Sequence, residues 1–138
     1  MPTSKDGGSP WGEFPFGELL GIRHVEYSSG HSIVSLKVQK KHLNPMNTVH
    51  GAVTFALADT GMALALYTSL SQGESLATLE IKITYLNPGK TGVLRCSTKV
   101  LHKGRRFAML ESEIMQEEQL IAKASGIYAM YLAKTQTE

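Results

Sequence analysis

The sequence predicts a single α+β domain in which a curved antiparallel sheet of five or six strands wraps round one long helix. Three features of the sequence indicate this arrangement. One helical segment is apolar on nearly its whole circumference, so other parts of the protein have to surround it. The segments around it alternate apolar and polar residues with the period of a half-buried strand. The turns between these segments are short, which favours antiparallel neighbours.

The length and composition fit one folded domain. The chain has 138 residues, of which 42% are hydrophobic and 19% are charged, close to the average for globular proteins. Fourteen Lys and Arg residues against 12 Asp and Glu residues leave a net charge of +2, too small a bias for a nucleic-acid partner. Residues 1–12 are rich in Gly, Ser and Pro, which predicts a flexible tail before a domain spanning residues 13–138.

The first half of the chain predicts a hairpin and then the helix. Strand-like runs at 22–27 and 33–38 flank the turn candidate Ser28-Ser29-Gly30-His31. A loop around Asn44-Pro45 then leads into a segment at 50–70 that is rich in Ala and Leu and has no proline, with Gly73 as its stop. An aspartate in the middle of this segment would cost about 2.5–3.5 kcal/mol at a bilayer centre, so we expect a buried helix and no membrane partner.

The second half of the chain predicts four more strands. The first, at 78–85, alternates cleanly between apolar and polar residues. The other three lie at about 93–101, 106–115 and 120–132, and turn candidates such as Asn87-Pro88-Gly89 and Lys103-Gly104 separate them. Strands joined by such short turns lie beside one another in an antiparallel sheet.

Cysteine and histidine usage predicts a metal-free protein of the cytoplasm. The single cysteine, Cys96, excludes an intrachain disulfide and a Cys-rich metal site, and its mid-strand position favours a core residue over a nucleophile. The five histidines have no metal-ligand spacing, and the N-terminus lacks the apolar core of a secretory signal. We therefore expect no metal, no cofactor and a cytoplasmic location.

Asp59 is the most unusual residue of the predicted helix, because a carboxylate in an apolar segment is costly to bury. It is either a structural residue satisfied by hydrogen bonds or a general base or nucleophile in a cleft. His50-Gly51 at the start of the same helix has two explanations as well. The pair is either an ordinary helix cap or an oxyanion site, where unpaired amides and the helix dipole face a ligand.

Taken together, Asn44, His50, Gly51 and Asp59 form the pattern N-x5-HG-x7-D. The stretch NPMNTVHGAVTFALAD resembles the signature of hotdog-fold acyl-CoA thioesterases of the phenylacetate-degradation (PaaI-like) type. The resemblance extends over residues 19–132, including LEIKITYLNPG after the helix and the HKGRR turn. It implies a hotdog fold and an enzyme that hydrolyses an acyl-CoA to the free acid and CoA without a cofactor.

The resemblance also implies roles for individual residues. Asp59 would activate the hydrolytic water or attack the thioester, and Thr78 would assist it. The Gly51 N–H and the Asn44 side chain would polarise the thioester carbonyl, and His50 would brace that loop. This chain has Ala52 where the family pattern has a second glycine, which narrows the space at the helix start.

The spacing of these residues predicts a dimer. Gly51 and Asp59 are eight residues apart, or about 12 Å along a helix at about 1.5 Å per residue, so one chain cannot bring both to one carbonyl. Two antiparallel helices related by a two-fold axis would place Gly51 of one subunit beside Asp59 of the other. We therefore expect a homodimer, or a homotetramer built as a dimer of dimers, and family members resemble this in having active sites at the dimer interface.

The basic turn at 103–106 is a candidate for binding the coenzyme A phosphates. Lys103, Arg105 and Arg106 could pair with phosphate groups, although a solvated turn would have the same composition. Two other functions are compatible with the sequence. One is a hotdog enoyl-CoA hydratase or hydroxyacyl dehydratase with His50 as its base, and the other is a non-catalytic acyl-CoA-binding module.

Overall fold

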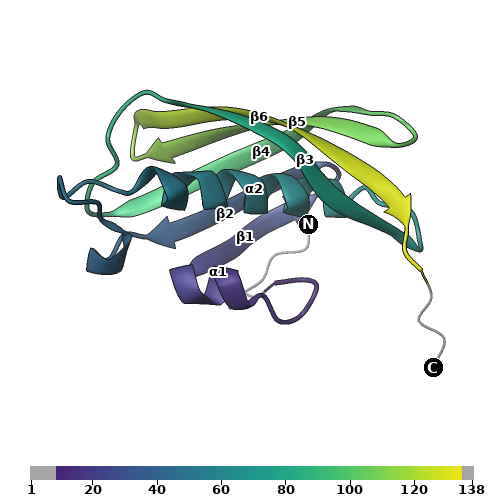
Figure 1. Ribbon diagram of the computed structural model, residues 1–138, viewed down its shortest axis with the longest axis horizontal. Helices are drawn as coiled ribbons and strands as arrows, with labels where there is room; N and C mark the ends of the chain where they lie inside the picture. The colour runs from purple at the N-terminus through teal and green to yellow at the C-terminus, as the bar shows by residue number, and fades with distance from the viewer. Residues whose placement is uncertain (1–8, 135–138) are drawn as a thin grey trace.

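A computed structural model describes residues 9–134 and has the predicted architecture: an antiparallel sheet curved round one long helix. Figure 1 shows the helix α2 lying along the concave side of the sheet, with the short helix α1 beyond β1. The helices are α1 (Pro15–Leu20), the 3-10 turn η1 (Lys40–His42) and α2 (Gly51–Tyr67). The strands are β1 (Ile22–Ser28), β2 (His31–Lys37), β3 (Glu74–Tyr85), β4 (Val93–Lys103), β5 (Phe107–Gln116) and β6 (Gln119–Leu132).

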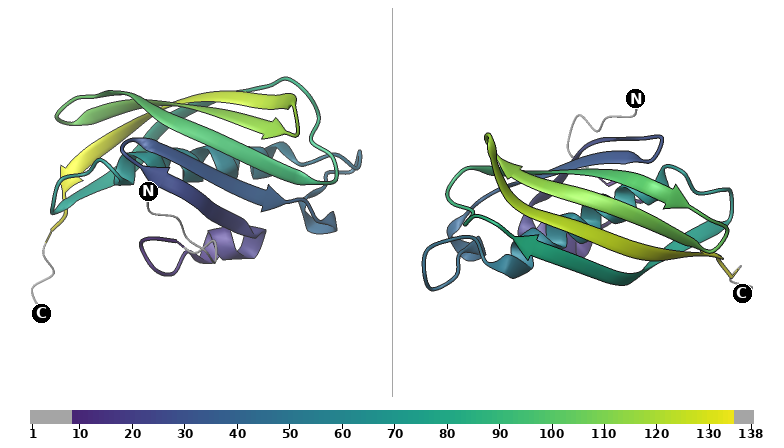
Figure 2. Two further views of the ribbon diagram at one scale, coloured as in Figure 1. Left: turned by 180° about the vertical axis from the view of Figure 1, so that it is seen from behind. Right: turned by 90° about the horizontal axis from the view of Figure 1, so that it is seen from above.

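The sheet has six strands in the order β1-β2-β4-β5-β6-β3, and every neighbouring pair is antiparallel. β1 and β3 are therefore the two edges, and α2 belongs to the long connection from β2 to the edge strand β3 (Figure 2). The predicted turn between β1 and β2 is confirmed: Ser28 pairs with His31, and Ser29 and Gly30 both have positive φ, as the tightest hairpin turn requires.

The core lies between α2 and the concave face of the sheet. Leu57, Met62, Leu64 and Leu66 of α2 have no exposed surface, and they pack with inward-facing residues of the strands. The inward-facing residues without exposed surface include Val34, Leu36, Leu94, Cys96, Leu110, Ile114 and Tyr128. Gly61 permits a close approach of the helix to the sheet, because a Cβ at this position would lie 2.7 Å from the Thr98 Oγ1 atom of β4.

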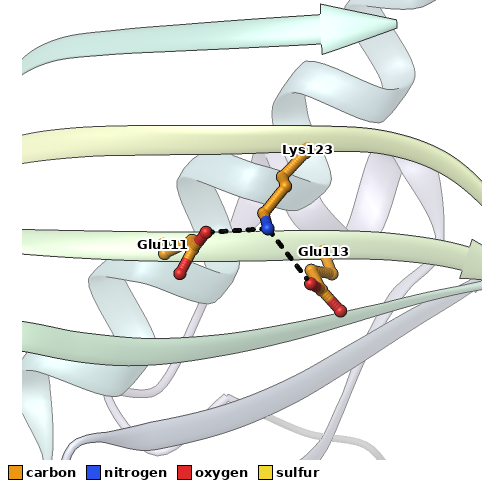
Figure 3. Close-up of polar contacts among 3 residues, drawn as sticks. All are labelled: Glu111, Glu113 and Lys123. Carbon is orange, nitrogen blue, oxygen red and sulfur yellow. Dashed lines mark ion pairs between the residues drawn. The ribbon is translucent and has the colours of Figure 1, made fainter. Parts of the chain in front are cut away.

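The convex face of the sheet is polar over its middle. Figure 3 shows Lys123 of β6 between two glutamates of β5, with its Nζ atom 3.1 Å from Glu111 and 3.5 Å from Glu113. The neighbours of Lys123 in β6, Ala122 and Ala124, point the other way and are buried. Exposed ion pairs of this kind contribute little stability, but they identify the face that helix α2 does not cover.

The N-terminal part of the described chain packs on the helix. The predicted tail includes Trp11, which is half-buried with its ring centroid 5.1 Å from that of Tyr67; residues 1–8 lie outside the described part. Helix α1 is not apparent from the sequence, because six residues beginning with Pro15 have no clear apolar period. Within residues 9–134, no helix combines the length and hydropathy needed to cross a membrane.

Candidate active site

Asp59 lies half-way along α2, eight residues from Gly51 and eight from Tyr67, and is half-buried. The hydroxyl of Thr78 on β3 donates a hydrogen bond of 2.8 Å to Asp59 Oδ1. The hydroxyl of Tyr128 on β6 donates to the same Oδ1 atom and, at 3.0 Å, to the Asp59 main-chain carbonyl. Both side-chain bonds fall on Oδ1, so Oδ2 has no hydrogen-bond partner among the described residues. The carboxylate is thus held in one orientation with one oxygen unoccupied.

Tyr128 contributes to this site although its sequence context does not mark it as a functional residue. Its side chain has no exposed surface, and burial, followed by the negative charge of Asp59, raises the pKa of its phenol far above the ordinary value. The phenol therefore stays protonated and remains a hydrogen-bond donor. The sequence indicates this role only weakly, because a tyrosine in an alternating strand is typical of a core residue whose hydroxyl makes a hydrogen bond to some nearby acceptor.

The start of α2 forms a second polar group. The His50 side chain caps the helix by accepting a hydrogen bond of 3.0 Å from the Ala52 amide, and the Val53 amide donates to the His50 carbonyl at 2.9 Å. Within the part of the chain that the structure describes, the Gly51 amide has no acceptor. Tyr85 at the end of β3 donates a hydrogen bond of 2.7 Å to the Gly51 carbonyl. An amide at the positive end of a helix without an acceptor can stabilise an oxyanion.

Asn44 has a local role in the single chain. Its Oδ1 atom accepts hydrogen bonds from the amides of Met46 at 2.9 Å and Thr48 at 3.2 Å, and its Nδ2 atom donates to the Thr48 hydroxyl at 2.9 Å. These bonds shape the loop that leads into α2. Asn44 therefore fixes the approach to the helix start.

The two polar groups do not meet within one chain. Gly51 and Asp59 occupy the same helix, about 12 Å apart along its axis at about 1.5 Å of rise per residue. The sheet leaves one stripe of α2 uncovered, which has Asp59 at its centre. The partly or fully exposed residues of this stripe are Ala52, Phe55, Asp59, Ala63 and Tyr67. Apart from Asp59 the stripe is apolar, and an uncovered apolar stripe of this length on an otherwise buried helix is typical of an interface.

The basic turn lies near the far end of α2. Lys103 Nζ donates a hydrogen bond to the carbonyl of Ser69, just after the helix, and its charge helps to lower the pKa of Glu74. Arg105 and Arg106 are exposed in the turn between β4 and β5. Of the three predicted phosphate ligands, the two arginines are the ones without a hydrogen bond or ion pair from their side chains among the described residues.

Cys96 lies in the core, close to Tyr128. It has no exposed surface, and burial raises the pKa of its thiol to about 11, so the thiol is protonated and unreactive at neutral pH. Among residues 9–134, no three His, Cys, Asp or Glu side chains come together in a group that could hold a metal ion.

Comparisons with known proteins identify the family. A family model described as the Thioesterase superfamily matches residues 46–123, from the loop before α2 into β6. The chain belongs to this superfamily. The expected hotdog fold is confirmed too: a conserved protein of Pseudomonas aeruginosa has a structure of the same shape, with a TM-score of 0.84 and 34% identity, over 86% of this chain and 95% of that one.

Two relatives carry thioesterase names. The acyl-coenzyme A thioesterase PaaI of Escherichia coli is 32% identical over 103 residues, which cover 74% of this chain and 71% of that protein. Human acyl-coenzyme A thioesterase 13 is 28% identical over 119 residues, covering 85% of this chain and 84% of that protein. The predicted PaaI-like resemblance is therefore confirmed, and the chain is a hotdog thioesterase.

Proposed function

We propose that this hotdog thioesterase hydrolyses acyl-CoA thioesters with Asp59 as its catalytic carboxylate. The observation that carries the proposal is the set of bonds to Asp59: Thr78 and Tyr128 hold Oδ1, and Oδ2 has no hydrogen-bond partner among the described residues. The acyl-coenzyme A thioesterase names of the two relatives support the substrate class.

In the proposed reaction, Asp59 Oδ2 takes a proton from water as the water oxygen attacks the thioester carbonyl carbon. The carbonyl oxygen gains negative charge, and the Gly51 amide at the start of a second α2 helix donates a hydrogen bond to it. The tetrahedral intermediate then breaks its carbon–sulfur bond, and the CoA thiolate takes the proton from Asp59. A direct attack by Oδ2 would instead form an anhydride that water opens, and it uses the same carboxylate orientation.

The second helix belongs to a partner subunit in this proposal. In an antiparallel pair of helices that places Gly51 beside Asp59 of the partner subunit, Phe55 lies half-way between them and faces its own copy at the two-fold axis. Phe55 is 37% exposed on the uncovered stripe, which fits this position. The edge strand β3 is also available, with Leu79 at 55% exposure and no strand beyond it among the described residues.

The basic turn completes the proposal. Arg105 and Arg106 bind the CoA phosphates, and Lys103 has a smaller share because Ser69 already accepts from it. Within one chain the turn lies at the C-terminal end of α2, so an antiparallel partner brings its own turn toward the helix start.

The two alternative functions, a hotdog hydratase or dehydratase and a non-catalytic acyl-CoA-binding module, have no comparable support. His50 uses Nδ1 to cap α2 and not as a base, and the unoccupied Asp59 Oδ2 favours turnover over binding alone.

Release of free CoA thiol from a panel of acyl-CoA substrates tests the function, and Asp59→Asn tests the site. The variant is nearly isosteric but not basic, so kcat should fall by about 10²-fold or more while the fold is kept. Circular dichroism and the melting temperature check the fold. Undiminished turnover in the folded variant would remove Asp59 from the reaction.

A further inference from the structure

A cavity of about 240 Å³ lies beside the second half of α2. Its apolar lining comes from three parts of the chain: Trp11 before α1, Ala63, Tyr67 and Leu70 in and after α2, and Leu76 of β3. Glu74 lines one side, where its carboxylate accepts a hydrogen bond of 2.7 Å from the Ser71 amide.

The lining of this cavity begins one helical turn from Asp59. Ala63 is one helical turn beyond Asp59, about 6 Å along the axis at about 1.5 Å per residue, and both belong to the uncovered stripe. Leu76 is two residues before Thr78 in β3, and alternate residues of a strand share a face. A thioester whose carbonyl lies at Asp59 can therefore place its acyl group directly in the cavity.

Trp11 forms part of the cavity wall beside Tyr67, and its ring is held in place. The Trp11 ring lies edge-on to those of Tyr67, at a centroid distance of 5.1 Å, and His24, at 5.9 Å. His24 is 2% exposed, so this support is part of the core. Ring contacts of this geometry stabilise one orientation of the indole.

We propose that Trp11 is a specificity-determining residue, which closes the acyl cavity so that it accepts compact apolar acyl groups and rejects long chains. The inference rests on the proposed acyl-CoA hydrolysis. A cavity of about 150 Å³ is enough to hold benzene, so 240 Å³ holds a short chain or a single ring. The Ser71 amide is the main cause of a lowered pKa of Glu74, which keeps a negative charge at the side of the cavity and disfavours acyl groups that end in a carboxylate.

The first test uses fluorescence, because Trp11 is the single tryptophan of the chain. The full-length protein is titrated with S-hexyl-coenzyme A, a thioether that no thioesterase can cleave, and with coenzyme A alone. The hexyl compound should shift the emission of Trp11, and coenzyme A should not. No shift at concentrations where calorimetry shows the thioether bound would overturn the inference. This result is independent of whether the protein hydrolyses anything.

The second test measures substrate choice. In Trp11→Ala, the ratio of kcat/KM for palmitoyl-CoA to that for hexanoyl-CoA should rise by about 10-fold or more, because the wall is removed. Trp11→Phe keeps a smaller ring and should give an intermediate ratio. This milder variant still tests the inference if Trp11→Ala does not fold. Phe16→Ala is the control, since Phe16 is 55% exposed on α1 and does not line the cavity. Unchanged ratios in both Trp11 variants would overturn the inference, whereas absence of all hydrolysis in the wild type would overturn the proposed function instead.

Discussion

The orientation of one carboxylate depends on two hydroxyl donors that come from different strands. Thr78 is on the edge strand β3 and exposed, whereas Tyr128 is on β6 and fully buried. The buried donor is the more rigid of the two, since its phenol is fixed by the core and also donates to the main chain of Asp59. We therefore regard Tyr128 as the principal positioning residue for Asp59.

Tyr128→Phe should lower kcat by about 10-fold and leave KM nearly unchanged, because the hydrogen bond lost is worth about 1.5–3 kcal/mol when its acceptor is charged. Steady-state kinetics measures both parameters. Tyr131→Phe is the matched control, three residues further along the same strand and 49% exposed. Equal kcat in the two variants would make Tyr128 a core residue without a part in positioning.

Among individual functional residues, the sequence predicts those whose residue type is unusual for the predicted element that contains them. Asp59 was found because a carboxylate is rare in an apolar helix, and Gly51 because it follows a capping residue at the helix start. Tyr128 and Tyr85 were not found, because a tyrosine in an alternating strand is ordinary. Their role depends on which helix residue the hydroxyl reaches, and this is a property of the packed structure.

At the scale of elements, α2 approaches the sheet most closely in the region of Gly61, where no side chain separates the helix from β2 and β4. Ser32 of β2 donates a hydrogen bond of 2.6 Å to the Gly61 carbonyl, and the Thr98 hydroxyl lies within 2.6 Å of that of Ser112. The absence of a side chain at Gly61 allows this polar contact inside the core.

Gly61→Ala should destabilise the protein by about 1–3 kcal/mol, as overpacking of a core does. A Cβ there would be 2.7 Å from Thr98 Oγ1 and 3.2 Å from Cys96 Sγ. This cost exceeds the gain of about 1 kcal/mol that alanine brings to a helix interior. Urea unfolding measures the difference, and an unchanged or higher midpoint would show that α2 moves away without penalty.

The basic turn between β4 and β5 permits a second test at this scale. Arg105→Ala combined with Arg106→Ala should raise KM for acyl-CoA more than it lowers kcat, since phosphates far from the thioester bind equally in the ground and transition states. The increase in KM should become smaller as the salt concentration rises. Arg95→Ala, which removes an exposed arginine in β4, is the control. A double variant with the KM of the wild type at low ionic strength would show that the turn is solvated and does not bind the phosphates.

The elements themselves were largely predictable. The six strands and the start of the helix at Gly51 follow from periodicity and from the cap. β3 was predicted from residue 78 but begins at Glu74, because pairing of Glu74 with Leu132 in β6 extends it through residues of low strand propensity. Tertiary contacts also explain why α1 and η1 are not apparent from the sequence: each has few residues, and its formation depends on contacts with the rest of the domain.

For the whole molecule, the decisive question is whether two chains share each site. Mixing Asp59→Asn subunits with Gly51→Val subunits gives mixed dimers in which one site has both defects and the other is intact. Random mixing makes about half of the dimers mixed, so about a quarter of wild-type activity should return.

Each variant alone, at the same total concentration, is the control for this experiment, and native mass spectrometry verifies that subunits exchange. Exchange without recovered activity would mean that each chain builds its own site. In that case Gly51 would not act on the carbonyl that Asp59 serves.

The place of Thr78 on the edge strand has a consequence for the timing of activity in the cell. In a single chain its hydroxyl is exposed, so solvent competes for the bond to Asp59. A partner lying along β3 would exclude that solvent and deliver the second helix start in the same event. On the shared-site proposal, a newly made chain is silent until it meets another, and dilution below the dissociation constant of the dimer switches the enzyme off.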